Sequence, residues 1–141
     1  MQVFITGSPI ETAQALDARR FNKQLVECKQ ILDAIDGAKA WRNHPCVLQY
    51  KEHREWLVHY MYCLMCYQRG WLIDAGHHSE LADSMRPSFH TDAYFDQMKR
   101  RLYTKMPEHY NQWELLGESD VNWYFVDGEW MYYRSGKRIE L

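Results

Sequence analysis

Charged side chains of both signs lie beside the apolar stripe of an expected helix. In the stretch "LDARRFNKQLVECKQIL", Leu16 to Leu32, a turn of about 100° per residue places Arg20, Lys23 and Glu27 on one strip. A carboxylate in such a place either takes part in a reaction or only forms ion pairs on a solvated surface. Spacing alone favours a solvated ladder of ion pairs, because Lys23 and Glu27 stand four residues apart.

Basic residues gather in three parts of the sequence, and aromatic residues alternate with the last group. Cations hold phosphates and aromatic rings stack on unpaired bases, so such a combination suits nucleic-acid binding. We expect the last group to contact DNA and the middle one to be a solvated helix face, whereas DNA contact of the first group follows only from a family resemblance. The groups are Arg19, Arg20 and Lys23; Lys99, Arg100, Arg101 and Lys105; and Arg134, Lys137 and Arg138 with Trp130, Tyr132 and Tyr133.

Histidine and cysteine give little support for metal or redox chemistry. His44 precedes a proline at an expected helix start, where it either caps the helix or approaches DNA. His77 and His78 match no familiar zinc spacing, and the C-x-x-C from Cys63 to Cys66 lacks a second pair. We therefore expect reduced thiols and no metal. Hydrolase, nucleotide-triphosphatase and dehydrogenase motifs are also missing.

Length and composition predict one domain over residues 1–141, with a core of ordinary size. The formal net charge is −2, so DNA binding would have to come from local basic patches. Aromatic residues make up 15% of the chain, which is high and suggests a binding surface beyond the core. The sequence shows no signal peptide or membrane span, and we expect a cytoplasmic protein.

Capping signals divide the sequence into expected helices. Ser8, Pro9 and Glu11 form a capping box after an extended arm, and we expect one helix from there to about Gly37. Its apolar stripe consists of Phe21, Leu25, Cys28, Leu32 and Ile35.

Further along the chain, Pro45 and Gly70 bracket a second helix that ends at Arg69, and a short helix is expected over residues 79–85. Another expected helix starts at Thr91 and Asp92.

The C-terminal part predicts strands. Asp127 and Gly128 stand between two aromatic-rich runs, the signal for a two-residue type I′ hairpin. The alternative is that these aromatics cap the helical core without pairing. The expected class is therefore all-α, a mainly helical single domain with a C-terminal β-hairpin.

Four short segments, in order, resemble the pyrimidine-dimer DNA glycosylase and endonuclease V family. They are Leu16-Asp17 followed by Glu27, "HPCVLQY" from His44, "RGW" from Arg69, and "WMYYRSGK" from Trp130. The resemblance implies a compact helical protein that extrudes a nucleotide from duplex DNA and cleaves the glycosidic bond at a damaged pyrimidine.

The same resemblance implies catalytic roles. In that family the N-terminal α-amine attacks the sugar C1′ to form a Schiff base, which undergoes β-elimination. An α-amine has an ordinary pKa of about 7.7–8.0 and is partly unprotonated at neutral pH. Glu27 would transfer the proton, while Arg20 and Lys23 would hold phosphates. Gln2 is too bulky for removal of the initiator, so Met1 would carry the amine.

The resemblance implies no cofactor, double-stranded DNA as the partner, and a monomer in a bacterial or phage-infected cytoplasm. Val26 and Gln30 stand where the family pattern has arginines, which leaves fewer phosphate contacts on this helix. A non-cleaving DNA-binding or base-modification protein on the same scaffold is the alternative, and a helical protein-interaction module is another. The three functions predict different results. The glycosylase cleaves at a lesion, the non-cleaving protein binds duplex DNA without strand scission, and the interaction module shows no salt-dependent DNA binding.

Overall fold

Helices form most of the chain, and three strands follow them. The computed structural model describes residues 1–141 and confirms the mainly helical class with a C-terminal hairpin. The elements are α1 (Pro9–Ala15), α2 (Ala18–Ile35), α3 (Pro45–Tyr50), α4 (Arg54–Gln68), α5 (Leu72–Ser84), α6 (Asp92–Lys105), the 3₁₀ helix η1 (Asn111–Leu116), β1 (Val121–Val126), β2 (Glu129–Arg134) and β3 (Lys137–Ile139).

The single long helix expected from Ser8 to Gly37 is wrong, because the chain breaks after α1. Ser8 is the N-cap as expected, since its hydroxyl accepts a hydrogen bond from the Glu11 amide at 3.2 Å; the Glu11 carboxylate accepts from that hydroxyl at 3.0 Å. Leu16 and Asp17 are extended, and the Asp17 side chain accepts from the Arg20 amide at 3.4 Å to cap α2. Asp17 thus ends one helix and starts another, as a short polar side chain can.

The helix expected from Pro45 to Arg69 is also two helices. α3 ends at Tyr50, and α4 begins at Arg54. This break brings the Tyr50 ring onto Trp56, with ring centroids 5.4 Å apart, and both side chains are fully buried. Burial of two large aromatic rings outweighs the continuity of one helix.

The short helix expected over residues 79–85 is the last part of the longer α5. The side chains that α5 buries are small: Ala75, Ser79 and Ala82. Its sequence therefore lacks a stripe of large apolar residues, which explains why the pattern did not reveal its first half. The start of α6 is as expected, since the Thr91 hydroxyl accepts from the Tyr94 amide at 3.2 Å.

The hairpin is confirmed, and a further strand extends it. Asp127 and Gly128 have φ values of 52° and 79°, and Val126 pairs with Glu129, which fits a type I′ turn. Ser135 and Gly136 repeat the same signs of φ and add β3, which the sequence analysis did not predict. The aromatics of β1 and β2 are therefore paired, and the alternative without strand pairing is wrong.

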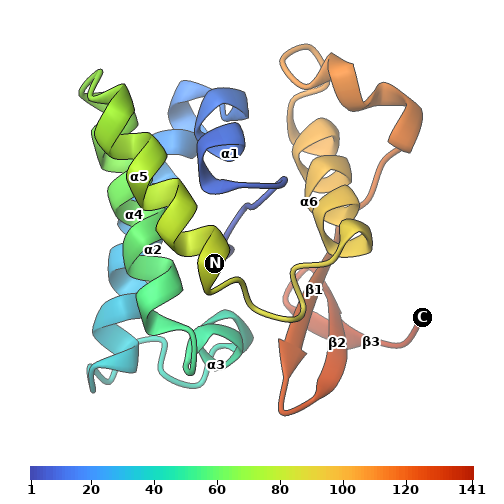
Figure 1. The fold of residues 1–141 in the computed structure, drawn as a ribbon. Helices are drawn as coiled ribbons and strands as arrows, with labels where there is room; N and C mark the ends of the chain where they lie inside the picture. The colour runs from blue at the N-terminus through green and yellow to red at the C-terminus, as the bar shows by residue number, and fades with distance from the viewer.

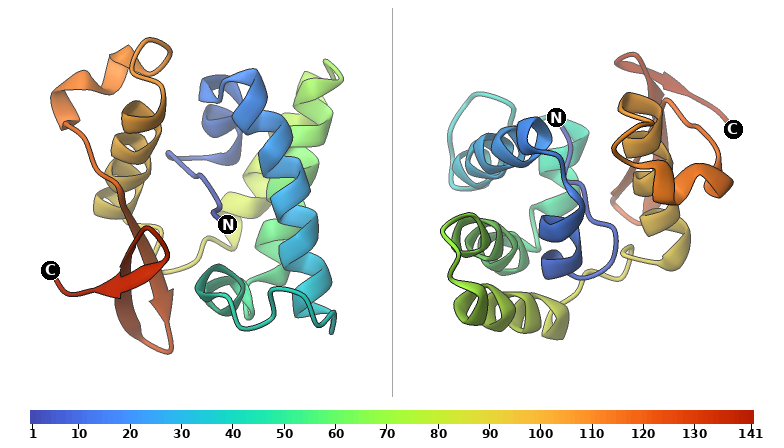
Figure 2. Two further views of the ribbon diagram at one scale, coloured as in Figure 1. Left: turned by 180° about the vertical axis from the view of Figure 1, so that it is seen from behind. Right: turned by 90° about the horizontal axis from the view of Figure 1, so that it is seen from above.

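The N-terminal arm, Met1–Gly7, runs between two groups of elements. Figures 1 and 2 show α1, α2, α4 and α5 packed together on one side, with α6 and the sheet on the other. One cluster of 26 buried hydrophobic residues draws on the arm, the helices and the sheet, so the two groups share a core. None of the helices combines the length and the apolar character needed to cross a membrane.

Candidate active site

The extended N-terminal arm is held by one glutamine of α2. Gln24 accepts the Phe4 amide hydrogen through Oε1 at 2.6 Å, and its Nε2 donates to the Gln2 carbonyl at 2.8 Å. The Tyr60 hydroxyl of α4 donates to the Phe4 carbonyl. Because Gln24 and Tyr60 are fully buried, these bonds fix the start of the chain against the helical group.

Glu27 lies directly beside the start of the chain. Its Oε2 accepts the backbone N–H of Gln2 at 3.1 Å, and the residue is only 8% exposed. The α-amine of Met1 is three covalent bonds from that nitrogen, a span of at most about 4 Å. The Met1 carbonyl is held separately by the Tyr124 hydroxyl at 3.0 Å. The structure therefore brings the two predicted catalytic groups, Glu27 and the terminal amine, into one place.

The Lys23–Glu27 ion pair that spacing favoured is confirmed, but the solvated ladder around it is wrong. Lys23 Nζ is 3.8 Å from Glu27 Oε1, but the lysine side chain is 69% exposed while the glutamate is buried. Arg20 pairs with Asp17 rather than with Glu27. The buried face of α2 extends past its apolar stripe to Gln24 and Glu27, because the N-terminal arm covers that side.

A cavity of about 290 Å³ opens next to Glu27, between the arm, α2, α6 and β1. Five of its lining residues are cationic and one is a carboxylate, so this site is basic although the whole chain is not. Such a charge balance suits a substrate with phosphates. The lining residues are Met1, Gln2, Phe4, Arg19, Arg20, Lys23, Gln24, Glu27, Arg101, Lys105 and Asn122.

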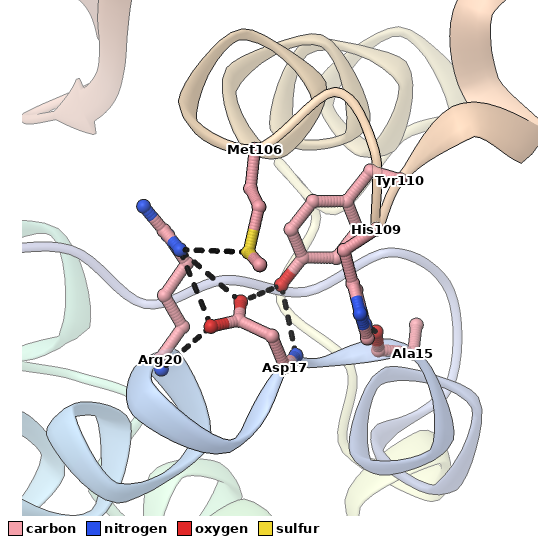
Figure 3. Close-up of polar contacts among 6 residues, drawn as sticks. All are labelled: Ala15, Asp17, Arg20, Met106, His109 and Tyr110. Carbon is pink, nitrogen blue, oxygen red and sulfur yellow. Dashed lines mark hydrogen bonds and ion pairs between the residues drawn. The ribbon is translucent and has the colours of Figure 1, made fainter.

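Arg20 is oriented by the residue that caps α2. Its Nη1 lies 3.3 Å from both Asp17 oxygens, and the Tyr110 hydroxyl donates to the same carboxylate (Figure 3). The Asp17 amide in turn donates to the Tyr110 oxygen at 3.0 Å. Burial alone would raise the pKa of Asp17, but these hydrogen bonds and the charge of Arg20 outweigh it and lower that pKa. Asp17 therefore stays ionised and positions Arg20 at the cavity.

The cluster on α6 was expected to be solvated, and this is wrong for two of its members. Arg101 and Lys105 line the cavity, one turn apart on the same face. Burial lowers the pKa of each, and the charges of Arg101, Arg20 and Lys23 lower that of Lys105 further. These cations therefore repel one another, and a bound anion would reduce that repulsion.

One face of the sheet continues the cavity wall. Asn122 lines the cavity and pairs across β1 and β2 with Tyr133, which pairs in turn with Arg138 on β3. Directly opposed residues of antiparallel strands project to the same side. Tyr133 also contacts Tyr124, with ring centroids 5.6 Å apart. Of the three C-terminal aromatics predicted to contact DNA, Tyr133 is the one on this face.

The other predicted C-terminal residues lie elsewhere. Trp130 and Tyr132 are on the opposite face of the sheet, where Trp130 packs on Tyr94 of α6 at 5.6 Å. Arg134 forms an ion pair of 2.9 Å with the aspartate that precedes β1. Lys137 is exposed on β3. The structure does not bring these four side chains to the cavity.

His44 caps α3, which is one of the two roles expected from the sequence. Its Nδ1 accepts the Cys46 amide hydrogen at 3.0 Å. Burial lowers its pKa, and the positive charge of the N-terminal amine lowers it further. The side chain is half-buried and does not line the cavity.

Several cavity residues escaped the sequence analysis. Gln2, Gln24 and Asn122 are uncharged and lie in segments whose packing the sequence pattern does not reveal. A signal was available for Arg101 and Lys105, because their four-residue spacing puts both on one helix face. No group of three or more His, Cys, Asp or Glu side chains is arranged to hold a metal ion, and the four cysteines are free thiols.

The fold and the cavity define a mainly helical protein in which the start of the chain and a buried carboxylate line one basic cavity. Residues 1–78 match the family model described as pyrimidine dimer DNA glycosylase, and the chain belongs to this family. The expected resemblance is thereby confirmed, and the family's substrate is DNA. No curated protein and no solved structure matches the chain. The α6 and β1 side of the cavity lies outside the matched residues.

Proposed function

We propose that this protein is a DNA glycosylase and apurinic-site lyase that acts on damaged or modified pyrimidines in duplex DNA. The contact that carries the proposal is the hydrogen bond from the Gln2 amide to Glu27 at 3.1 Å. It holds a carboxylate beside the start of the chain, in a cavity whose rim is basic. Membership of the pyrimidine dimer DNA glycosylase family supports DNA as the substrate.

The first step is displacement of the base. The lone pair of the Met1 nitrogen attacks C1′, the bond from C1′ to the base breaks, and the base leaves with that electron pair and takes up a proton. The nitrogen then loses a proton and expels O4′ of the sugar ring, which is protonated. A protonated imine between Met1 and C1′ results. In this proposal Glu27 accepts and returns the protons, a role that its hydrogen bond with the Gln2 amide supports.

The second step is β-elimination. A base removes a proton from C2′, the released electron pair forms a carbon–carbon double bond, and the C3′–O bond breaks with loss of the phosphate. Water then hydrolyses the imine and frees the amine. The cationic rim formed by Arg19, Arg20, Lys23, Arg101 and Lys105 would hold the phosphates on either side of the sugar.

Borohydride trapping on a duplex with one abasic site tests the proposal, because reduction fixes the imine as a covalent adduct. We expect the unmodified chain to give an adduct whose mass maps to its first peptide. Acetylation of the Met1 amine should abolish the adduct. Glu27→Gln, which can still accept the Gln2 amide hydrogen, should slow its formation by about a hundredfold or more.

Two lysines in the cavity provide the control, since each is a competing primary amine. The variants Lys23→Met and Lys105→Met should still give an adduct on the first peptide at saturating protein. An adduct that survives acetylation would show that the α-amine is not the nucleophile. Salt-sensitive duplex binding without any adduct would favour the non-cleaving DNA-binding protein. Absence of both would leave the protein-interaction module.

A further inference from the structure

The first peptide group of the chain is held on both sides by side chains from different parts of the fold. Its N–H, on Gln2, donates to the Glu27 carboxylate of α2 at 3.1 Å. Its carbonyl, on Met1, accepts from the Tyr124 hydroxyl of β1 at 3.0 Å, and this is the only hydrogen bond that Met1 makes within the protein. The peptide bond is trans and planar, so the two groups point in opposite directions. The two hydrogen bonds therefore fix both the position and the plane of the peptide group.

The fixed peptide group leaves the α-amine of Met1 a single backbone rotation. Only the torsion about the Cα–C bond of Met1 moves that nitrogen relative to the peptide plane. The same torsion moves the Met1 side chain, which packs against the hydrophobic core. Turning the amine away would therefore pull this side chain out of its packing. The position of the amine thus depends on the two hydrogen bonds of the first peptide group.

Tyr124 is itself held in place. It is 3% exposed, and its backbone pairs with Met131 of β2. Its ring contacts the rings of His44 and Tyr133 edge-on, with centroids 5.8 and 5.6 Å away. Burial raises the pKa of the Tyr124 hydroxyl, which therefore stays protonated and donates at neutral pH. A donor locked by its own packing holds its acceptor in one geometry.

We propose that Tyr124 is a positioning residue for the nucleophile: by holding the Met1 carbonyl, it directs the α-amine into the cavity beside Glu27. This inference rests on the proposed glycosylase and lyase function, and it adds a residue outside the family match over residues 1–78. Glu27 belongs to the helical group and Tyr124 to the sheet, so the amine is placed only when both groups of elements are docked. Tyr124 does not line the cavity and would act through Met1 rather than on the substrate.

The variant Tyr124→Phe tests this role, because it removes the hydroxyl and keeps the buried ring. Adduct formation on the abasic duplex is followed by borohydride trapping in single turnovers, over a range of protein concentrations. We expect the plateau rate to fall about tenfold or more, because a misplaced nucleophile reacts less often. The concentration that gives half of the plateau rate should stay the same, since Tyr124 does not line the cavity.

Tyr94→Phe is the matched control. Tyr94 is also buried, and its hydroxyl accepts a hydrogen bond from Gln49 at 3.2 Å. It neither binds Met1 nor lines the cavity. This variant carries a similar cost for a lost buried hydroxyl, and it should keep the plateau rate of the unmodified chain.

A second measurement observes the first peptide group directly and needs no DNA. Met1 and Gln2 form the only Met–Gln pair in the sequence, so ¹³C-carbonyl methionine with ¹⁵N glutamine gives a single carbonyl–amide signal in NMR spectra. A hydrogen bond moves a carbonyl carbon downfield. The Met1 signal of the unmodified chain should therefore lie downfield of its position in the urea-unfolded chain. It should move upfield in Tyr124→Phe and stay in place in Tyr94→Phe.

The outcomes separate this inference from the function on which it rests. While the unmodified chain forms its adduct, an unchanged plateau rate in Tyr124→Phe, an equal loss in Tyr94→Phe, or a change confined to half-saturation would overturn the positioning role. A Met1 carbonyl signal at its unfolded position would overturn the contact itself. Absence of the adduct from the unmodified chain, with the carbonyl signal as expected, would remove the proposed function and the positioning role together.

Discussion

At the scale of single residues, the surroundings of a carboxylate decide what it can do. Glu27 and Asp33 both face a lysine four residues away on α2, yet Glu27 is buried and Asp33 is exposed. The difference comes from the backbone of residue 2, which covers Glu27 and donates a hydrogen bond to it. Helix spacing cannot predict such a contact, because the partner lies 25 residues away.

The two lysines of these pairs permit a matched comparison. Lys23 lines the cavity, whereas Lys29 does not and pairs with Asp33 at 3.0 Å. We expect Lys23→Ala to weaken duplex binding and to reduce the slope of log affinity against log salt by about one. Lys29→Ala should change neither. Fluorescence anisotropy over a salt series measures both, and equal slopes in the two variants would contradict a phosphate contact at Lys23.

The sequence singled out Glu27 and the terminal amine as candidate catalytic groups, but it did not reveal the residues that hold them. Leu16-Asp17 and Glu27 could be recognised because a motif of a few residue types at a fixed spacing is visible in the sequence itself. Gln24, which holds the N-terminal arm through two hydrogen bonds, is one polar residue among many on a helix. Its role depends on the arm and on Tyr60, and neither is adjacent in the sequence.

At the scale of elements, the sequence predicts what local chemistry determines. The caps at Ser8 and Thr91 and the turn at Asp127 depend on residues within a few positions, and all three are confirmed. The breaks after Leu16 and Tyr50 were missed. The break after Leu16 satisfies a distant partner, since Tyr110 binds Asp17. The break after Tyr50 lets Trp56 of the next helix stack on Tyr50, a packing contact that capping signals do not reveal.

The break at Asp17 predicts a measurable coupling between α2 and the segment that follows α6. Tyr110→Phe removes a hydroxyl from a buried carboxylate, and Asp17→Asn removes the charge; each should lower the free energy of unfolding by about 1–3 kcal/mol. The double variant should lose less than the sum. Asp33→Asn, at an exposed ion pair on α2, should cost under about 1 kcal/mol. Additive losses in urea denaturation would refute the coupling.

At the scale of the whole molecule, an aromatic cluster joins the two groups of elements across the N-terminal arm. His90, just before α6, is its centre and is 4% exposed. Its Nε2 lies 2.8 Å from the Tyr50 hydroxyl, while its ring contacts Trp56 edge-on at 4.6 Å and stacks on Tyr94 at 5.6 Å. The cavity draws its walls from the same two groups of elements, although none of these four aromatic residues lines it.

This cluster makes the stability of the whole fold sensitive to acid. Burial, with smaller effects from the charges of Arg86 and His53, lowers the pKa of His90 from 6.5 to about 3. The unfolded chain then binds a proton below about pH 6.5 that the folded chain does not bind. Above that pH, His90 is neutral in both states and does not change the free energy of unfolding. Its burial lowers that free energy as the pH drops from about 6.5 toward about 3.

The contribution of His90 to this slope is at most about 1.4 kcal/mol per pH unit. His90→Gln should flatten the dependence of the unfolding free energy on pH, whatever it does to stability at neutral pH. Part of the slope will remain, since His44 and His53 also have lowered pKa values. The exposed His77→Gln is the control and should keep the full slope. Denaturant titrations between about pH 5 and about pH 7 measure it, and an unchanged slope in His90→Gln would show that protonation of His90 does not open the cluster.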